Sequence, residues 1–486
     1  MNDFTELLSR LWPLLLLIAH LGGAVAVTIH ALLHKRDVAA VTGWIGLAWL
    51  APVIGPILYL CLGVNRIQRK GISLGLHEAW DHREAPEMIR EDEMRTAELS
   101  RRYPTLVGLA RLGEQVTGHP ILPGNAVEPL VDGDEAYPQM LAAIDEATTS
   151  VNLLSYIFDS DRSGEQFLAA LKRACARGVE VRVLIDSVGA AYSKPNMADR
   201  LKKEGVPVAE FLPSRGMKFL PYANMRNHRK ILVTDGKTAF TGGTNIREGH
   251  CLELQPVFPV QCIHFRVEGP VVAQLQEAFA IDWAFATGET LAGLAWFPKI
   301  ERCGPVGARG IPDGPDEDLD KISDVILGAL SVADRAVRIV TPYFLPDQSV
   351  QRALAVTAMR GVTVDILLPG HNNIGIMNWA VVPQLPFLLE KGCRVHFSGD
   401  PFDHTKLFVV DGVWALIGST NWDPRSLRLN FEYNLECYDE TLASRLETII
   451  DDKLADARPV GMGELDGRAR PVKLRDNAAR LLSPYL

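Results

Sequence analysis

The chain has 486 residues, 47% of them hydrophobic, which is enough for two or three domains. Its formal net charge of -9 argues against a nucleic-acid binder, because such proteins normally carry a basic excess. The seven cysteines lack paired spacing, and no Cys-x2-Cys or His-Glu-x2-His signature occurs, so we expect reduced thiols, no metal and no cofactor.

Two uncharged stretches lie near the start of the chain. Residues 11–33 and 38–65 contain no Asp, Glu, Lys or Arg, and a helix of about 20 apolar residues crosses a hydrocarbon core. The first stretch is too long, and lacks the cleavage context, for a removed signal peptide. We therefore predict that residues 1–70 form a transmembrane helical hairpin with spans at about 11–33 and 41–64.

A hairpin places the N-terminus and the rest of the chain on the same side of the membrane. More basic residues flank that side than occupy the turn: Arg10, Arg66, Arg69 and Lys70 against Lys35 and Arg36. Because positive loops favour the inside of a cell, and the cysteines are expected to be reduced, we predict that the large remaining part is cytoplasmic.

Beyond the hairpin, residues 71–118 are polar and are expected to form a linker. Two halves follow, at 119–300 and 301–486, and each contains a predicted strand, helix and strand. These elements are expected at 150–157, 164–177 and 179–185 in the first half, and at 336–341, 348–360 and 362–368 in the second. Two β-α-β units at matching positions predict α/β halves with parallel sheets that pack together.

Each half also contains one copy of the motif His-x-Lys-x4-Asp. The copies are His228, Lys230 and Asp235, then His404, Lys406 and Asp411. A glycine stands fourteen residues after each histidine, and Thr-Asn follows at sixteen and seventeen, which gives Asn245 and Asn421. Packing constrains apolar residues more than polar ones, so a repeat this close at polar positions indicates one active site built from two halves.

The residue types suit phosphoryl chemistry. With an ordinary pKa of about 6.5, one histidine can attack as a neutral nucleophile while the other donates a proton. Lys230 and Lys406 would lie beside the histidines as fixed cations if the motif is extended, and Asn245 and Asn421 would add amide donors. Such donors stabilise the charge on phosphoryl oxygens.

The two motif aspartates have a second interpretation. Asp235 and Asp411 complete the candidate catalytic set, yet each begins an Asp-Gly pair after an apolar strand, which is a turn signature. We interpret them as structural residues that fix the turn and anchor the motif.

With these motifs the chain resembles the phospholipase D superfamily, and within it the bacterial cardiolipin synthase family. Further matching stretches lie at 227–230, 267–270, 341–344, 418–432 and 482–486. The resemblance implies two phospholipase D-like α/β halves related by pseudo-twofold symmetry, preceded by the hairpin, in a multi-pass protein of the bacterial inner membrane. It also implies phospholipid substrates, and the sequence leaves oligomerisation open.

The resemblance further implies a phosphatidyltransferase. One histidine, with His228 favoured, would attack a phosphatidyl donor to form a phosphohistidine, and an incoming alcohol would then resolve it. Two phosphatidylglycerol molecules would give cardiolipin and glycerol. The alternatives are a phospholipase D hydrolase, a transphosphatidylase with another acceptor or donor such as phosphatidylethanolamine, and a non-enzymatic membrane scaffold with a decayed site.

One position departs from the family pattern. Glu432, 28 residues after His404, stands where the family keeps a carboxylate that orients a catalytic histidine, but the repeat-equivalent residue is Cys262. A thiol with an ordinary pKa of about 8.5 stays mostly protonated and cannot stabilise an imidazolium as a carboxylate does. Either Glu253 substitutes from the preceding loop or one histidine is less well oriented.

Three segments are candidates for lipid contact outside the hairpin. Residues 217–222 mix apolar and basic side chains and 374–382 are unusually apolar, and either segment could instead belong to a core. Residues 472–482 have amphipathic helical spacing with basic residues, which suits either an interfacial helix or a docked one.

Overall fold

The computed structural model describes most of the chain: residues 2–35, 38–63, 101, 103–212, 225–315 and 318–483. The chain divides into an N-terminal unit, Met1–Ser73 with Ser214–Met225, and a large unit, Leu74–Pro213 with Arg226–Leu486. The predicted linker up to residue 100, the basic residues at 66, 69 and 70, and the segment 217–222 lie outside the described residues.

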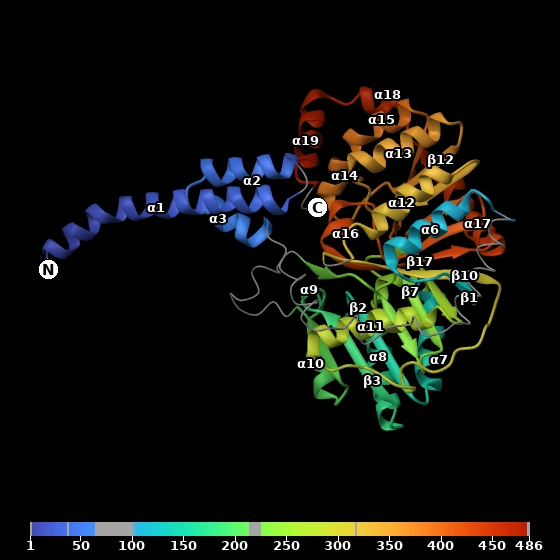
Figure 1. The fold of residues 1–486 in the computed structure, drawn as a ribbon. Coiled ribbons are helices and arrows are strands. Elements are labelled where there is room, and N and C mark those ends of the chain that lie inside the picture. Colours follow the sequence, from blue (N-terminus) through green and yellow to red (C-terminus); the bar gives the residue numbers. More distant parts are fainter. Residues whose placement is uncertain are drawn as a thin grey trace. The chain divides into compact units, whose positions relative to one another are not determined.

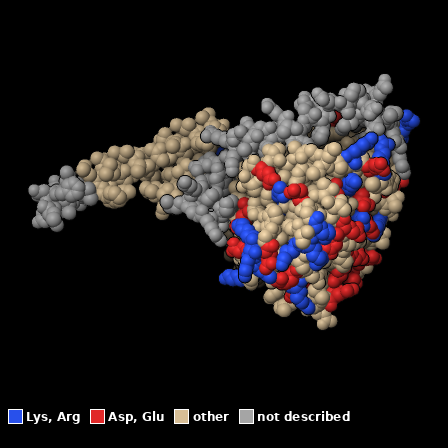
Figure 2. Space-filling model, turned by 90° about the horizontal axis from the view of Figure 1, so that it is seen from below, with Lys and Arg blue, Asp and Glu red and all other residues tan. Residues whose placement is uncertain are grey.

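The N-terminal unit contains helices α1 (Asn2–His34), α2 (Val38–Leu50) and α3 (Ile54–Leu58), followed by the π-helix η1 (Tyr59–Gly63). Within α1, Leu11–His34 is long and apolar enough to cross a membrane, and Figure 2 shows this helix without charged side chains over that stretch. Small residues, Ala24 and Ala31, are buried where α1 packs against α2.

The second predicted span is not one continuous helix. Helix α2 ends at Leu50, and the chain turns at 51–53, where Val53 has φ 63°. Pro52 has no backbone N–H, so it cannot continue the α-helical hydrogen bonds of the preceding turn. Among the described residues, Leu11–His34 is the single helix of sufficient length. The two-span hairpin is therefore not confirmed.

A mixed β-sheet runs through the large unit, and Figure 1 shows the first half (cyan to yellow-green) and the second half (yellow to red) on either side of β10, β1 and β17. The first half contributes β1 (Leu122–Val131), β2 (Ser150–Ser155), β3 (Glu180–Asp186), β4 (Val208–Phe211), β6 (Ile231–Thr234), β7 (Thr238–Gly242) and β9 (Ile263–Glu268). The second contributes β10 (Val306–Asp313), β11 (Ala336–Val340), β12 (Thr363–Pro369), β13 (Arg394–Ser398), β15 (Leu407–Val410), β16 (Trp414–Gly418), β17 (Asn430–Tyr438) and β18 (Arg458–Pro459).

The strand order reads alike outward from the centre. Antiparallel β1 and β10 meet there; β9, β7, β6, β2, β3 and β4 follow on one side, and β17, β16, β15, β11, β12 and β13 on the other. Each of these seven strands on one side thus has a counterpart on the other, and β18 extends the second half beyond β13. The pseudo-twofold α/β fold expected from the resemblance is confirmed.

The predicted β-α-β units are present, with helices α8 (Arg162–Ala176) and α13 (Gln348–Met359) between their strands. The expectation of parallel sheets holds at the outer strands alone, because β6, β7 and β9, like β15, β16 and β17, are antiparallel. The reason lies in the turns at 235–237 and 411–413, each of which begins with Asp-Gly: a three-residue turn joins antiparallel neighbours, whereas a parallel connection needs a long crossover.

Each half has its own apolar core. The core of the first half forms under α7 (Asp132–Glu146) and α8, and α11 (Val272–Thr287) also packs on the first half. The core of the second half forms under α12 (Lys321–Val332), α13 and α15 (Leu385–Glu390), and α17 (Glu440–Ala455) also packs on the second half. Helix α6 (Leu106–Thr117) packs against α12, and its Leu106 and Leu109 are buried in the second core. The end of the stretch that composition assigns to a linker therefore belongs to a folded half.

The C-terminal helix is docked. Helix α19 (Arg470–Arg480) packs against α14 (Gly375–Val381), Ala479 is buried there, and the Arg475 guanidinium lies 4.5 Å from the Trp379 ring centroid. Leu474 and Leu481 remain exposed on α19 and just after it. On the face of the large unit drawn in Figure 2, basic and acidic side chains are interspersed among the described residues, so that face has no basic stripe.

Candidate active site

Both motif histidines line one cavity in the large unit, of about 570 Å³. The ring centroids of His228 and His404 are 6.4 Å apart, with the rings nearly perpendicular. Both side chains are largely buried. The two halves thus place two imidazoles within reach of a single phosphoryl group, although 176 positions separate them in the sequence.

The histidines are held by short strands that cross between the halves. Strand β5 (Arg226–Asn227) pairs with the start of β17, and the His228 N–H donates to the Phe431 carbonyl at 2.8 Å. Likewise β14 (Phe402–Asp403) pairs with β8 (Val260–Gln261), and the His404 N–H donates to the Gln261 carbonyl at 2.7 Å. The next residue after each of these carbonyls therefore lies beside the histidine. It is Glu432 beside His228, and Cys262 beside His404.

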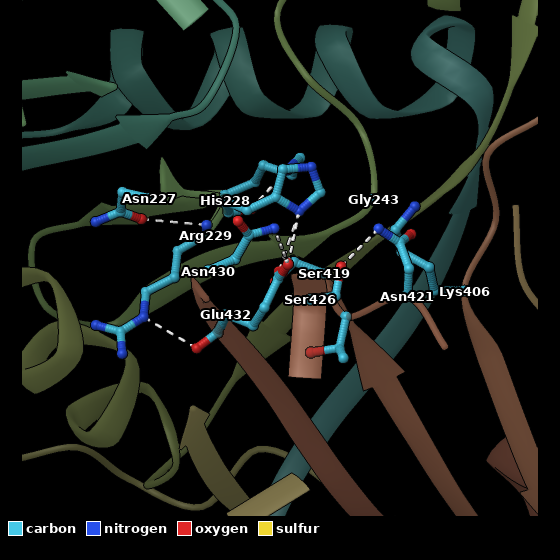
Figure 3. Close-up of polar contacts among 12 residues, drawn as sticks. Asn227, His228, Arg229, Gly243, Lys406, Ser419, Asn421, Ser426, Asn430 and Glu432 are labelled. Atoms are coloured by element: carbon cyan, nitrogen blue, oxygen red, sulfur yellow. Dashed lines mark hydrogen bonds and ion pairs between the residues drawn. The ribbon is translucent and has the colours of Figure 1, made fainter. Parts of the chain in front are cut away.

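Glu432 thus serves the histidine of the other half. His228 Nδ1 lies 3.0 Å from one Glu432 carboxylate oxygen and 3.1 Å from the other. Ser419 Oγ and Asn430 Nδ2 donate to the same carboxylate at 2.5 and 3.2 Å, as Figure 3 shows. Because a carboxylate accepts, Nδ1 of His228 carries the hydrogen, and Nε2 is left with its lone pair.

The charges of this pair agree with that assignment. Burial lowers the pKa of His228 to about 4, with Lys230 and Lys406 adding to the effect and Glu432 opposing it. Burial by itself would raise the pKa of Glu432, but His228, Lys230 and the Ser419 hydroxyl outweigh it and lower that pKa. Near neutral pH the pair is a neutral imidazole bonded to a carboxylate, as a nucleophile requires.

His404 has no carboxylate on its ring among the described residues. Its Nδ1 lies 3.2 Å from the Gly243 carbonyl oxygen, which fixes the same tautomer. Cys262 Sγ instead donates to the His404 carbonyl at 3.3 Å, and burial raises the pKa of this thiol. Burial, then Lys406 and Lys230, lower the pKa of His404 well below 6.5.

The structure decides between the two accounts of Cys262. Glu253 is exposed, in the 3-10 helix Leu252–Leu254, and its backbone N–H points to Asp134, so it does not replace the missing carboxylate. Gly243, the counterpart of Ser419, leaves no room for a side chain, because a Cβ there would lie 2.6 Å from Cys262 Sγ. The two histidines are therefore held by different groups.

Replacing Cys262 by aspartate should raise turnover. A carboxylate here would stand in the place that Glu432 occupies beside His228, and it would stabilise the imidazolium form of His404. The measurement is kcat against pH, with Cys262→Asn as the uncharged control of equal size. Unchanged or lower turnover in the aspartate variant would count against an orienting role for this position.

The two motif lysines lie beside the histidines. Lys230 Nζ donates to the His228 carbonyl at 2.6 Å, and Lys406 Nζ lies 2.8 Å from the His404 carbonyl and 3.2 Å from both ring nitrogens. Burial lowers the pKa of Lys230 to about 7 and that of Lys406 to about 8. Both ammonium groups are charged below these values and lose the charge as pH rises.

The lysine pKa values predict a pH-dependent KM. Above about pH 7 to 8 the phosphate-binding charge is lost, so KM for an anionic lipid should rise by up to about tenfold per pH unit. Lys230→Arg keeps its charge through this range because a guanidinium has a pKa above about 12. KM in this variant should depend less steeply on pH, whatever its kcat; an equally steep profile would exclude Lys230 as the titrating group.

Asn245 and Asn421 both line the cavity, at matching positions of the two halves. The Asn245 side-chain oxygen accepts from the Ile157 N–H at 3.2 Å, which leaves its amide NH2 available to a ligand. Asn421 Nδ2 donates to Ser426 Oγ at 2.9 Å, and its buried oxygen has no hydrogen-bond partner within the described chain. We propose that each asparagine contacts a bound phosphate through an amide N–H, which for Asn421 is the second N–H of Nδ2, because an amide oxygen only accepts.

The motif aspartates lie at the ends of strands and contact backbone. Asp235 accepts from the N–H groups of Thr148, Thr149 and Ser150 at 2.7–3.1 Å, and Asp411 from those of Asp334, Arg335 and Ala336 at 2.7–2.9 Å. Their φ angles are 50° and 54°, in the left-handed region that aspartate tolerates. We propose that both are structural anchors rather than reacting groups.

Replacing Asp411 by alanine should destabilise the protein by about 2–3 kcal/mol, because three backbone donors lose a charged acceptor. Thermal unfolding in detergent measures this loss. The specific activity of the folded fraction should stay close to wild type, and Asp411→Asn, which tolerates the same φ, should be less destabilised. A stable but inactive alanine variant would instead place Asp411 in the chemistry.

Several cavity residues are not indicated by the repeat. His250 is buried 6.5 Å from the His404 ring, and burial lowers its pKa to about 3. Tyr156 packs 5.0 Å from the His228 ring, and Tyr343 packs 6.1 Å from that of His404. These side chains have no equivalent at matching positions, so no internal comparison of the sequence could find them. Ser419 is adjacent to a repeated glycine, a signal that could have found it.

Comparison with known proteins agrees with this geometry. The family model described as cardiolipin synthase, PLD-like domain, matches residues 140–283 and 326–454. The chain belongs to this family. The chain is 30% identical to the major cardiolipin synthase ClsA of Bacillus subtilis over 93% of this chain and 95% of that protein. It is 29% identical to a cardiolipin synthase of Listeria welshimeri over 95% and 96%.

The fold is shared more widely than the sequence. The crystal structure of the phosphatidylserine synthase of Haemophilus influenzae matches 78% of this chain and all of that chain, with a TM-score of 0.60 and 16% identity. At this identity the likeness concerns the fold alone. The ranges that the family model matches include both His-x-Lys-x4-Asp motifs.

Proposed function

We propose that this protein is a membrane phosphatidyltransferase that makes cardiolipin and glycerol from two molecules of phosphatidylglycerol. The proposal rests on the two imidazoles, 6.4 Å apart in one cavity, each with a lysine beside it. The curated relatives named as cardiolipin synthases, similar over almost the whole chain, support cardiolipin as the product, and phosphatidylglycerol as donor and acceptor is part of our proposal.

In the first step, the lone pair of His228 Nε2 attacks the donor phosphorus and the bond to the glycerol oxygen breaks. Glu432 balances the positive charge that develops on the His228 ring, which favours this histidine as the nucleophile. His404, protonated while the anionic phosphate is bound, gives its proton to the leaving oxygen. Lys230 and Lys406 stabilise the charge on the non-bridging oxygens.

In the second step, a hydroxyl of the acceptor lipid takes the place of the departed glycerol. Neutral His404 Nε2 removes its proton, the oxygen attacks phosphorus, and the bond between phosphorus and His228 breaks. His228 returns to its neutral form, and His404 again carries the proton for the next cycle. One diester bond is broken and one is formed, so no further reactant is required.

The full-length protein, purified and supplied with defined lipids, tests the function. Mass spectrometry should find a lipid with two phosphates and an equal amount of glycerol from phosphatidylglycerol alone. Phosphatidic acid as the main product would indicate a hydrolase with water as the acceptor. A product that requires phosphatidylethanolamine would change the donor.

We also propose that the N-terminal unit holds the protein in the bacterial inner membrane, with the large unit in the cytoplasm. The apolar helix Leu11–His34 supports a membrane location. Labelling of the exposed Cys303 by an impermeant thiol reagent should require opened cells. Labelling in intact spheroplasts would place the large unit outside.

A further inference from the structure

Beyond the histidines, the cavity wall is not symmetric. Arg226 on β5 stands two residues before His228, and Phe402 on β14 stands two residues before His404, so these two residues are counterparts. Arg425, in helix α16 (Pro424–Arg428), and Gly249 each stand 21 residues after the histidine of their own half. Arg226 of the first half and Arg425 of the second both line the cavity with His228, so two cations stand where the equivalent positions hold an aromatic ring and a glycine.

The two guanidiniums are close enough to affect each other. Burial lowers the pKa of Arg425, and the charge of Arg226 lowers it further. Tyr156 and Asp423 partly offset this lowering, and the charge of Arg226 in turn lowers the pKa of Asp186 against the effect of burial. An anion placed between the two arginines would relieve their repulsion and receive bidentate hydrogen bonds.

The proposed reaction brings two phosphates into this cavity. The donor phosphate lies between the histidines and lysines, and the acceptor brings a second phosphate that does not react. In the product, the two are separated by one three-carbon glycerol bridge, so the second phosphate must lie close to the first. Arg226 precedes His228 by two residues in an extended segment, about 7 Å along the chain.

We propose that Arg226 and Arg425 form a subsite for the second, unreacting phosphate, that of the acceptor lipid. This inference rests on the proposed function and names the residues that select the acceptor. An acceptor hydroxyl attached to a phosphate is held in the cavity by charge, whereas water or a neutral alcohol has no such contact. The subsite thus favours transfer over hydrolysis.

The test compares two soluble acceptors that differ by one phosphate. The full-length enzyme receives a phosphatidyl donor with p-nitrophenol as leaving group, and either glycerol 3-phosphate or glycerol as acceptor. Wild type should prefer glycerol 3-phosphate. In Arg226→Gln and Arg425→Gln, kcat/KM for glycerol 3-phosphate should fall roughly ten- to hundredfold, the usual range for a lost charged hydrogen bond. Transfer to glycerol and the first burst of nitrophenol should change little.

Charge and position are controlled separately. Arg226→Lys should recover part of the preference because it restores a cation. Arg428→Gln, on the same helix but not among the residues that line the cavity, should behave as wild type. Arg247 also lines the cavity, in an ion pair with Asp159 at 3.2 Å, and a preference lost in Arg247→Gln alone would overturn the assignment.

The outcomes separate this proposal from the function itself. Equal losses with both acceptors, or loss of the nitrophenol burst, would overturn the subsite and assign the arginines to the donor or to folding. Cardiolipin formation by wild type would then still stand. A wild type that prefers glycerol 3-phosphate but makes no cardiolipin would keep the subsite and remove phosphatidylglycerol as the acceptor.

Discussion

Replacing His228 by alanine should abolish the release of p-nitrophenol from an activated phosphatidyl donor, whereas replacing His404 should leave one stoichiometric burst. A good leaving group departs without a proton, so the first step needs the nucleophile and not the acid. Transfer from phosphatidylglycerol should fall by about 10⁴-fold or more in both variants, because both steps of that reaction need the pair.

The trapped intermediate identifies the attacking ring. In His404→Ala, the phosphatidyl group should stay attached, and peptide mass spectrometry should find it on the His228 peptide. His250→Ala is the matched control, since this third imidazole is also buried and lines the same cavity; it should complete many turnovers. The opposite pattern would make His404 the nucleophile, and bursts in both variants would exclude a phosphohistidine.

Replacing Glu432 by glutamine should lower kcat by about 10³- to 10⁴-fold. The amide is similar in size, but it can present NH2 to Nδ1 of His228 and cannot balance a positive ring. The burst of nitrophenol should be slowed along with overall transfer, because the defect lies in the attacking residue. A structural defect would instead lower the amount of folded protein and leave the burst rate per active site unchanged.

Ser419→Ala provides a graded comparison for Glu432. This substitution removes one hydrogen bond to the same carboxylate and leaves the charge. Its kcat should therefore fall by nearer tenfold, as for a single charged hydrogen bond. If kcat falls no further in Glu432→Gln than in Ser419→Ala, the carboxylate is not the group that supports His228.

The sequence predicted a large part of this architecture because the molecule repeats itself. The β-α-β units, the Asp-Gly turns and the two motifs recur at matching positions, so one half supports the assignment of the other. The alignment of Cys262 with Glu432 also agrees with the structure. The pattern could not reveal that each of these residues faces the histidine of the opposite half, because that depends on how strands from distant segments pair.

Other features escaped prediction for local reasons. The break at 51–53 lies within an apolar stretch, so hydropathy does not register it, and Pro52 is the sequence signal that could have found it. Helix α6 follows a charged stretch, so average composition concealed the buried Leu106 and Leu109. The repeat has residues of other types at the positions equivalent to Arg226, Arg425 and His250, so their place in the cavity follows from the fold alone.

The exchange of short strands between the halves has an evolutionary consequence. In an assembly of two identical subunits, every substitution would appear twice, and both imidazoles would have to keep the same neighbours. When both copies lie on one chain, position 262 can hold a thiol while position 432 holds a carboxylate, and arginine can occupy one wall opposite phenylalanine. Under the proposed mechanism the two rings can therefore take different roles, one bonding phosphorus and the other moving protons.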